Sequence, residues 1–239
     1  MYSYTSLEKY MATSRFDVVS IGTLSRNILW HEKEPVRTAH ATTTLIRTGK
    51  KNILIDPGLP GSAIAARLYE RSGLKPHQID IVFLTNFQLA HRGGISAFPD
   101  AKWYVHELER EAVRTKYSAI LKELPDEADD EHRVIISREL EILDSCKDAP
   151  DKLVAGIDLF PLFGYTAGTC GLLLTLPTTT VLIAGDAVPT QEHFLVGQVL
   201  PDPYNLTAAK EALQEVYDIA DVIIPGHDNV FQCPRAAGM

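Results

Sequence analysis

Several short stretches of this chain alternate between apolar and polar positions, and stretches with helical spacing separate them. Apolar or β-branched runs predict strands at 16–22, 41–48, 53–55, 79–84, 102–105, 134–136, 141–143, 156–160, 171–176, 180–183 and 222–224. Helical spacing predicts helices at 62–73, 93–98, 107–124 and 206–217. The polar stretch 27–40 and the acidic stretch 125–133 are expected to be loops. This order predicts two sheets covered by helices on their outer faces.

The chain has no internal repeat and no linker rich in glycine, proline or serine. We therefore expect an N-terminal tail over 1–15, a single domain over 16–232 and a C-terminal tail over 233–239. Residues 1–16 lack the continuous apolar segment of a secretory signal, and no apolar run is long enough for a transmembrane helix.

Charge and cysteine usage narrow the range of partners. The 239 residues include 23 Lys and Arg against 31 Asp and Glu, which gives a net charge of −8. Such a chain is not drawn to nucleic acid or to an anionic membrane, so we expect neither as a partner. The three cysteines, Cys146, Cys170 and Cys233, form no C-x-x-C pair. They predict reduced thiols and a cytoplasmic protein.

Acidic and imidazole side chains gather where predicted strands end. Loops at strand ends place reactive groups on a rigid support, so these corners are the candidate site. Four of them stand out: the Asp56-Pro57-Gly58 turn, the segment 85–94, the Gly185-Asp186 pair and the segment 225–228.

Taken in this order, the corners resemble those of the metallo-β-lactamase fold superfamily, over roughly residues 42 to 228. The family motif T-H-x-H-x-D-H begins here with Thr85 and ends with His91. The family G-D pair matches Gly185-Asp186, and the family P-G-H matches the segment that ends in His227. The resemblance implies an α/β fold, a four-layer αββα sandwich of metallo-β-lactamase type.

Four of the family's metal ligands are replaced. Asn86 and Gln88 stand where the motif has its first two histidines, Ala90 replaces its aspartate, and Tyr165 occupies the histidine position of the later G-H-T corner. Asparagine and glutamine offer only neutral amide oxygens, which are weak ligands for zinc. The resemblance therefore implies that the first metal position of the family is lost.

Three ligand positions match the family: His91, Asp186 and His227. Two imidazoles and a carboxylate are a sufficient set for one divalent ion, zinc or iron, with open coordination positions. Each residue also has a structural alternative, because a histidine or aspartate at a strand end can simply stabilise a turn. His193, seven residues after Asp186, is a fourth candidate ligand, and its alternative is an exposed loop histidine.

Further residues are candidates for supporting roles. Asp56 resembles the family aspartate that braces a metal-binding loop from behind. His40, Asn86, Gln88 and Arg92 are candidate substrate-binding residues, although an arginine such as Arg92 more often forms an ion pair.

Asp186 and Tyr165 are the candidate catalytic residues. Tyr165 would donate a hydrogen bond into the pocket or fill the space that a metal and an imidazole take in the family.

Three functions remain open. The first is a hydrolase with a degraded site and at most one metal ion, acting on a small ester, thioester, lactone or phosphoester. The second is a metal-free pseudoenzyme that binds a small ligand in the former active-site pocket. The third is a redox enzyme with a mononuclear iron. A small molecule is the expected partner in each case, and a homodimer is left open.

Overall fold

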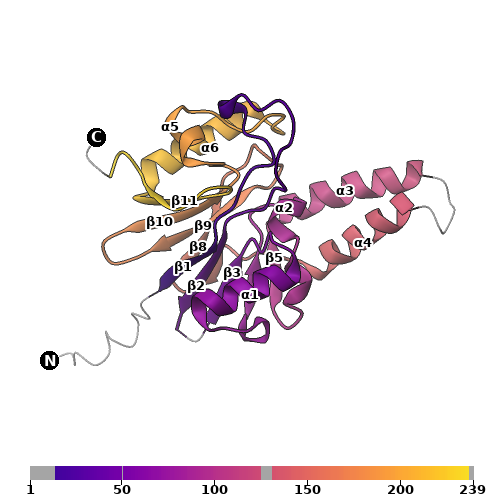
Figure 1. The fold of residues 1–239 in the computed structure, drawn as a ribbon, viewed down its shortest axis with the longest axis horizontal. Helices are drawn as coiled ribbons and strands as arrows, with labels where there is room; N and C mark the ends of the chain where they lie inside the picture. The colour runs from indigo at the N-terminus through magenta and orange to yellow at the C-terminus, as the bar shows by residue number, and fades with distance from the viewer. Residues whose placement is uncertain (1–13, 50, 125–130, 237–239) are drawn as a thin grey trace.

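The computed structural model describes residues 14–49, 51–124 and 131–236 (Figure 1). The strands are β1 (Arg15–Ser20), β2 (Thr43–Thr48), β3 (Lys51–Ile55), β4 (Ile81–Phe83), β5 (Lys102–Val105), β6 (Lys147–Asp148), β7 (Lys152–Val154), β8 (Ile157–Pro161), β9 (Cys170–Thr175), β10 (Thr180–Gly185), β11 (Val222–Pro225) and β12 (Phe231–Gln232). The α-helices are α1 (Gly61–Ser72), α2 (Leu89–Arg92), α3 (Glu107–Glu123), α4 (Glu131–Ser145), α5 (Gln191–Leu195) and α6 (Leu206–Ile219). Short 3-10 turns lie at Ile28–Trp30, Pro76–Gln78 and Ile95–Ala97.

The strands form two mixed six-stranded sheets, in the orders β1-β2-β3-β4-β5-β6 and β12-β11-β10-β9-β8-β7. In the first sheet β1, β2 and β3 pair antiparallel, whereas β3 to β6 pair parallel. In the second sheet the parallel pair is β10 with β11. Both sheets therefore have neighbouring strands whose carboxyl ends lie at the same edge, and this edge carries the candidate site.

Alternation along the strands builds three apolar layers. Ile53 and Ile55 of β3 pack between the sheets with Ile183 of β10. Leu54, between them in sequence, turns to the other face and packs under α1, whereas Leu182 of β10 packs under α6. Because side chains alternate between the two faces of a strand, each sheet has apolar residues on both of its faces. Figure 1 shows α1 and α6 on opposite outer sides of the sheets, and this confirms the predicted four-layer αββα arrangement.

One region differs from the expectation. Residues 134–136 and 141–143 were predicted as strands, but both lie inside α4. Ile136, Leu140 and Leu143 have the i, i+4, i+7 spacing of one helical face, and Leu140 and Leu143 pack into the core beside α1. Short apolar runs cannot be assigned from periodicity alone, because a buried helix face gives the same local pattern. Helix α4 also takes in residues 131–133 of the predicted acidic loop, while 125–130 lie outside the described residues.

The folded structure extends into both of the predicted tails. Arg15 and Cys233, both placed in the predicted tails, belong to the folded structure: Arg15 begins β1 and Cys233 is fully buried. Within the described ranges, none of the helices has the length and apolar character needed to cross a bilayer.

Glu109 of α3 joins two loops that border the candidate site. Its side chain is buried, and it accepts hydrogen bonds from the Phe87 amide at 3.0 Å, the Thr166 hydroxyl at 2.6 Å and the Gly168 amide at 3.0 Å. A buried carboxylate is tolerated when its oxygens are satisfied in this way. Glu109 therefore fixes the 85–88 loop to the 163–168 loop, which carries Tyr165.

We expect Glu109→Ala to lower the free energy of unfolding by about 2–4 kcal/mol, because it leaves buried amide and hydroxyl donors without an acceptor. Urea denaturation of the full chain measures this change. Glu111→Ala on the exposed side of the same helix is the matched control and should cost about 0.5 kcal/mol or less. An equal loss in the two variants would contradict the assigned role of Glu109.

Candidate functional site

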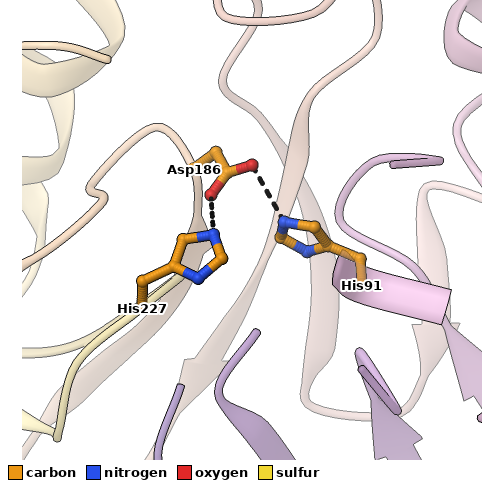
Figure 2. Close-up of side chains that lie close together, drawn as sticks. All are labelled: His91, Asp186 and His227. Carbon is orange, nitrogen blue, oxygen red and sulfur yellow. Dashed lines mark hydrogen bonds and ion pairs between the residues drawn. The ribbon is translucent and has the colours of Figure 1, made fainter. Parts of the chain in front are cut away.

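Three buried residues from three segments meet at the carboxyl ends of the strands. His91 lies in α2 after β4, Asp186 directly follows β10, and His227 follows β11. Figure 2 shows one imidazole on either side of the Asp186 carboxylate. His91 Nε2 lies 2.8 Å from Asp186 Oδ2, and His227 Nε2 lies 3.0 Å from Asp186 Oδ1. The cluster has one ligand-type atom from each residue, all within 4.8 Å of one another.

Asp56 holds His91 from behind. Asp56 Oδ2 lies 3.0 Å from His91 Nδ1, and the same carboxylate accepts from the Thr85 amide at 2.8 Å and the Thr85 hydroxyl at 2.7 Å. Both ring nitrogens of His91 therefore face a carboxylate, Nδ1 that of Asp56 and Nε2 that of Asp186, and Asp56 keeps the ring turned toward Asp186. The position predicted for Asp56, behind the site, matches this geometry.

Two backbone carbonyls hold His227 in the same manner. His227 Nδ1 lies 3.1 Å from the Thr23 oxygen and 3.0 Å from the His40 oxygen. A carbonyl oxygen only accepts, so Nδ1 carries the hydrogen and the neutral ring turns its Nε2 lone pair toward Asp186. Consistent with this, Asp186 Oδ1 has no aligned hydrogen bond within the described part of the chain, despite its closeness to His227.

Close backbone approach brings Asp186 into place. Gly185 has a φ of +53°, a left-handed conformation that favours glycine, and it turns the chain at the end of β10. A Cβ on Gly226 would lie 2.6 Å from Asp186 Oδ1, so only glycine lets the His227 loop come this near. Asn86 completes the surroundings, since its Nδ2 donates to Asp186 Oδ2 at 2.8 Å while its Oδ1 accepts from the Gln88 amide.

The charges of the cluster shift its pKa values in opposite directions. Burial favours the neutral form of His91, but the carboxylates of Asp186 and Asp56 outweigh burial and hold its pKa well above the usual range. Burial would raise the pKa of Asp186, but the charges of His91 and His227 hold it well below the usual range. The Asp186 carboxylate is therefore ionised at neutral pH.

A pocket of about 190 Å³ opens beside the cluster. Its polar lining includes Gln88, Tyr165, His193 and His227, and its apolar lining includes Ala90 together with residues of the 24–39 and 200–201 segments. Burial raises the pKa of Tyr165 to about 12, so its hydroxyl keeps its hydrogen at neutral pH. The structure thus brings Gln88 and Tyr165 together beside the triad.

Two predicted substrate-binding residues lie elsewhere. The imidazole of His40 lies against the carbonyls of Ile21 and Thr38, and only its backbone oxygen contributes to the site. His40 pairs with Thr23 as a β-bridge, so this segment meets His227 through its backbone.

Arg92 is buried and points away from the pocket. It forms an ion pair with Glu139 of α4, donates to the Phe87 oxygen and lies over the Phe87 ring. These contacts fit the ion-pair alternative for Arg92, and a role in substrate binding stays a prediction.

His193 is not a member of the 4.8 Å cluster, but it lines the adjoining pocket and is completely buried. Sequence reasoning missed Thr190, whose hydroxyl lies 2.8 Å from His193 Nδ1, and it missed Glu109. A threonine three residues before His193, at the start of a helix, is a capping signal that could have pointed to Thr190. A lone glutamate in a helix such as Glu109 carries no such signal.

The comparisons with known proteins agree with this geometry. The family model for the metallo-β-lactamase superfamily matches residues 37–227. No curated protein matches the sequence.

Solved structures similar to this chain include a candidate metallo-β-lactamase from Thermotoga maritima, with 19% identity, a TM-score of 0.65 and coverage of 92% of this chain and 99% of the other. A variant of AiiA from B. thuringiensis, with N-decanoyl-L-homoserine bound at its active site, has 20% identity and a TM-score of 0.61 over 90% of this chain and 92% of the other. AidC, a dizinc quorum-quenching lactonase, has 18% identity and a TM-score of 0.58 over 75% of this chain and 68% of the other.

At these identities the structures establish the fold alone. The family match covers most of the chain and includes His91, Asp186 and His227. The chain belongs to the metallo-β-lactamase superfamily.

Proposed function

We propose that this chain is a hydrolase that uses one divalent metal ion, held by His91, Asp186 and His227, to cleave a small ester, thioester, lactone or phosphoester. Membership of the superfamily and the similarity to the structure of AidC, described as a dizinc lactonase, support this reaction class. Zinc is the first metal to test, because imidazole nitrogen and carboxylate oxygen are its usual ligands.

One observation carries the proposal: the Nε2 atoms of two histidines face a single buried carboxylate. Both Nδ1 atoms are already engaged, by Asp56 behind His91 and by backbone carbonyls behind His227. Two imidazole nitrogens at 2.8 and 3.0 Å from an ionised carboxylate call for positive charge at this point. One divalent ion, or one added proton on each ring, would supply that positive charge.

The spacing fits one ion. Two ligands of a tetrahedral zinc ion, each about 2.0–2.1 Å from the metal, lie roughly 3.3 Å apart. His91 Nε2 lies 2.8 Å from Asp186 Oδ2 and His227 Nε2 lies 3.0 Å from Oδ1, near this value, and one ligand atom from each residue lies within 4.8 Å of the others. Three protein ligands leave a coordination position open, as in catalytic zinc sites. A metal ion at this place would polarise the scissile bond and lower the pKa of a bound water.

Residues around the cluster would orient the metal ligands and bind the substrate. Asp56 keeps the His91 ring turned toward Asp186, and the Asn86 amide holds the Asp186 carboxylate in position. Tyr165 keeps its hydroxyl hydrogen and can donate it to a substrate oxygen in the pocket. Ala90 leaves the pocket wall without the carboxylate that the family motif has at this position.

A second candidate function, metal-free binding of a small ligand, is favoured by a separate observation. The Asn86 amide turns its N–H toward Asp186 Oδ2, and its oxygen is engaged by the Gln88 amide. Asn86 therefore cannot act as a metal ligand in this orientation. It can help a protonated His91 to satisfy Asp186 with hydrogen bonds alone.

Elemental analysis of protein purified without chelators separates these functions. We expect about one divalent ion per chain, because the cluster offers three ligands to a single position. His227→Ala and the isosteric Asp186→Asn should each lose the metal, since each removes one of three ligands. Iron in place of zinc would redirect the activity screen from hydrolysis to oxidation.

His77→Ala is the matched control, because His77 lies on the exposed Pro76–Gln78 turn and should leave the metal content unchanged. Unchanged metal in His227→Ala would refute the site assignment. No metal in the wild type, even after incubation with zinc, iron and manganese salts, would favour the ligand-binding function.

Asp56→Asn should weaken metal binding by roughly 10- to 100-fold, because an amide no longer holds the Nδ1 hydrogen of His91 as a carboxylate does. Asparagine also tolerates the left-handed φ of +49° at this position, so the backbone should be preserved. Competition with a chromogenic chelator measures the dissociation constant. An Asp56→Asn protein with wild-type metal affinity would show that Asp56 only supports the fold.

A further inference from the structure

His193 is a buried histidine without a role in the metal cluster. Its ring lines the pocket beside His227, and its side chain is completely buried. Its Nε2 atom has no hydrogen-bond partner within the described ranges. A buried polar atom that lacks a partner costs free energy, so Nε2 is expected to bond to a water or to a bound ligand in the pocket.

Thr190 determines which nitrogen of His193 carries the hydrogen. The Thr190 hydroxyl accepts from the His193 amide at 3.2 Å and lies 2.8 Å from His193 Nδ1. The described residues offer this hydroxyl no other acceptor, so its own hydrogen is satisfied only when it donates to Nδ1. The neutral ring then carries its hydrogen on Nε2, which makes that atom a donor and unsuitable as a metal ligand.

Backbone hydrogen bonds hold His193 at a set position relative to the cluster. The His227 amide donates to the Pro189 oxygen at 2.7 Å, and the Gly226 amide donates to the Val188 oxygen at 2.9 Å. The Gln191 amide at the start of α5 donates to the Asp228 carboxylate at 3.2 Å. The turn that carries His193 and the loop that carries His227 are therefore tied together.

The pocket is small and mostly uncharged. Its volume is about 190 Å³. Arg26 is the permanently charged residue among those that line it, and Arg26 is exposed and donates to the Lys33 oxygen. A phosphoester carries charge that needs paired cationic donors, whereas a carbonyl oxygen is satisfied by a neutral N–H.

We propose that His193 is a specificity-determining residue whose Nε2–H donates a hydrogen bond to the carbonyl oxygen of a small uncharged acyl compound bound in this pocket. This narrows the substrate class from the four candidates to carboxylic esters, thioesters and lactones, and it rests on the proposed function in placing the substrate here. Thr190 is the positioning residue that keeps Nδ1 free of hydrogen.

The tautomer is tested first, by ¹⁵N nuclear magnetic resonance of protein labelled at histidine. We expect His193 to carry its hydrogen on Nε2 in the wild type and in Thr190→Ser, which retains the hydroxyl. Thr190→Val removes the hydroxyl and should shift His193 toward a mixture of tautomers. A wild-type His193 with its hydrogen on Nδ1 would overturn the proposal.

The ligand class is tested with 2-pyrrolidone, a stable cyclic amide that presents a carbonyl oxygen and is not hydrolysed. The experiment uses full-length protein stripped of metal, so its outcome does not depend on the proposed hydrolase activity. We expect the probe to shift the His193 Nε2–H resonance and to bind roughly three- to tenfold more weakly to His193→Phe, the loss of one hydrogen bond. His193→Gln, which keeps an N–H donor, should retain more affinity than His193→Phe.

His77→Phe is the control and should bind the probe as the wild type does. Equal binding to the wild type and to His193→Phe, or no binding to the wild type, would overturn the proposal. Tighter binding of inorganic phosphate than of 2-pyrrolidone would overturn the substrate class in favour of phosphoesters. Because His193→Phe lies outside the metal ligands, normal metal content with weaker probe binding separates this inference from the proposed function.

Discussion

A single buried carboxylate, Asp186, faces the Nε2 atoms of two histidines whose other ring nitrogens are already engaged. The acceptors behind the rings are the Asp56 carboxylate and two backbone carbonyls. This arrangement brings two imidazole nitrogens and an anion to one point, and it calls for positive charge there. The metal proposal follows from this constraint. The same close approach requires glycine at 226, beside the Asp186 carboxylate, and at 185, where the chain turns.

The fold supplies this arrangement through the ends of its strands. The segments after β3, β4, β10 and β11 bring Asp56, His91, Asp186 and His227 to one edge of the two packed sheets. The apolar layer between the sheets fixes the distance between strands that are far apart in sequence. Glu109 then joins the loops above that edge, so a charged residue of a distant helix contributes to the shape of the site.

The pocket beside the cluster differs in character from the cluster itself. The cluster is ionic, whereas the pocket is lined by apolar residues, neutral donors and one exposed arginine. His193 lies between the cluster and the pocket. The Thr190 hydroxyl bonds to its Nδ1, so that its Nε2 carries the hydrogen and has no lone pair for a metal. A metal centre beside a neutral donor is suited to compounds whose reacting group is a polar carbonyl on a small apolar body.

The amino-acid sequence by itself predicted the two covered sheets, because alternating strands show their two faces locally. It placed Asp56, His91, Asp186 and His227 at strand ends, and the family resemblance made them candidate site residues. Only the tertiary structure decided that Arg92 pairs with Glu139, that His40 acts through its backbone, and that 134–143 is helical. Those outcomes depend on partners that are distant in sequence. Ring tautomers and side-chain directions are set by such partners, and no local pattern records which partner a folded chain brings near.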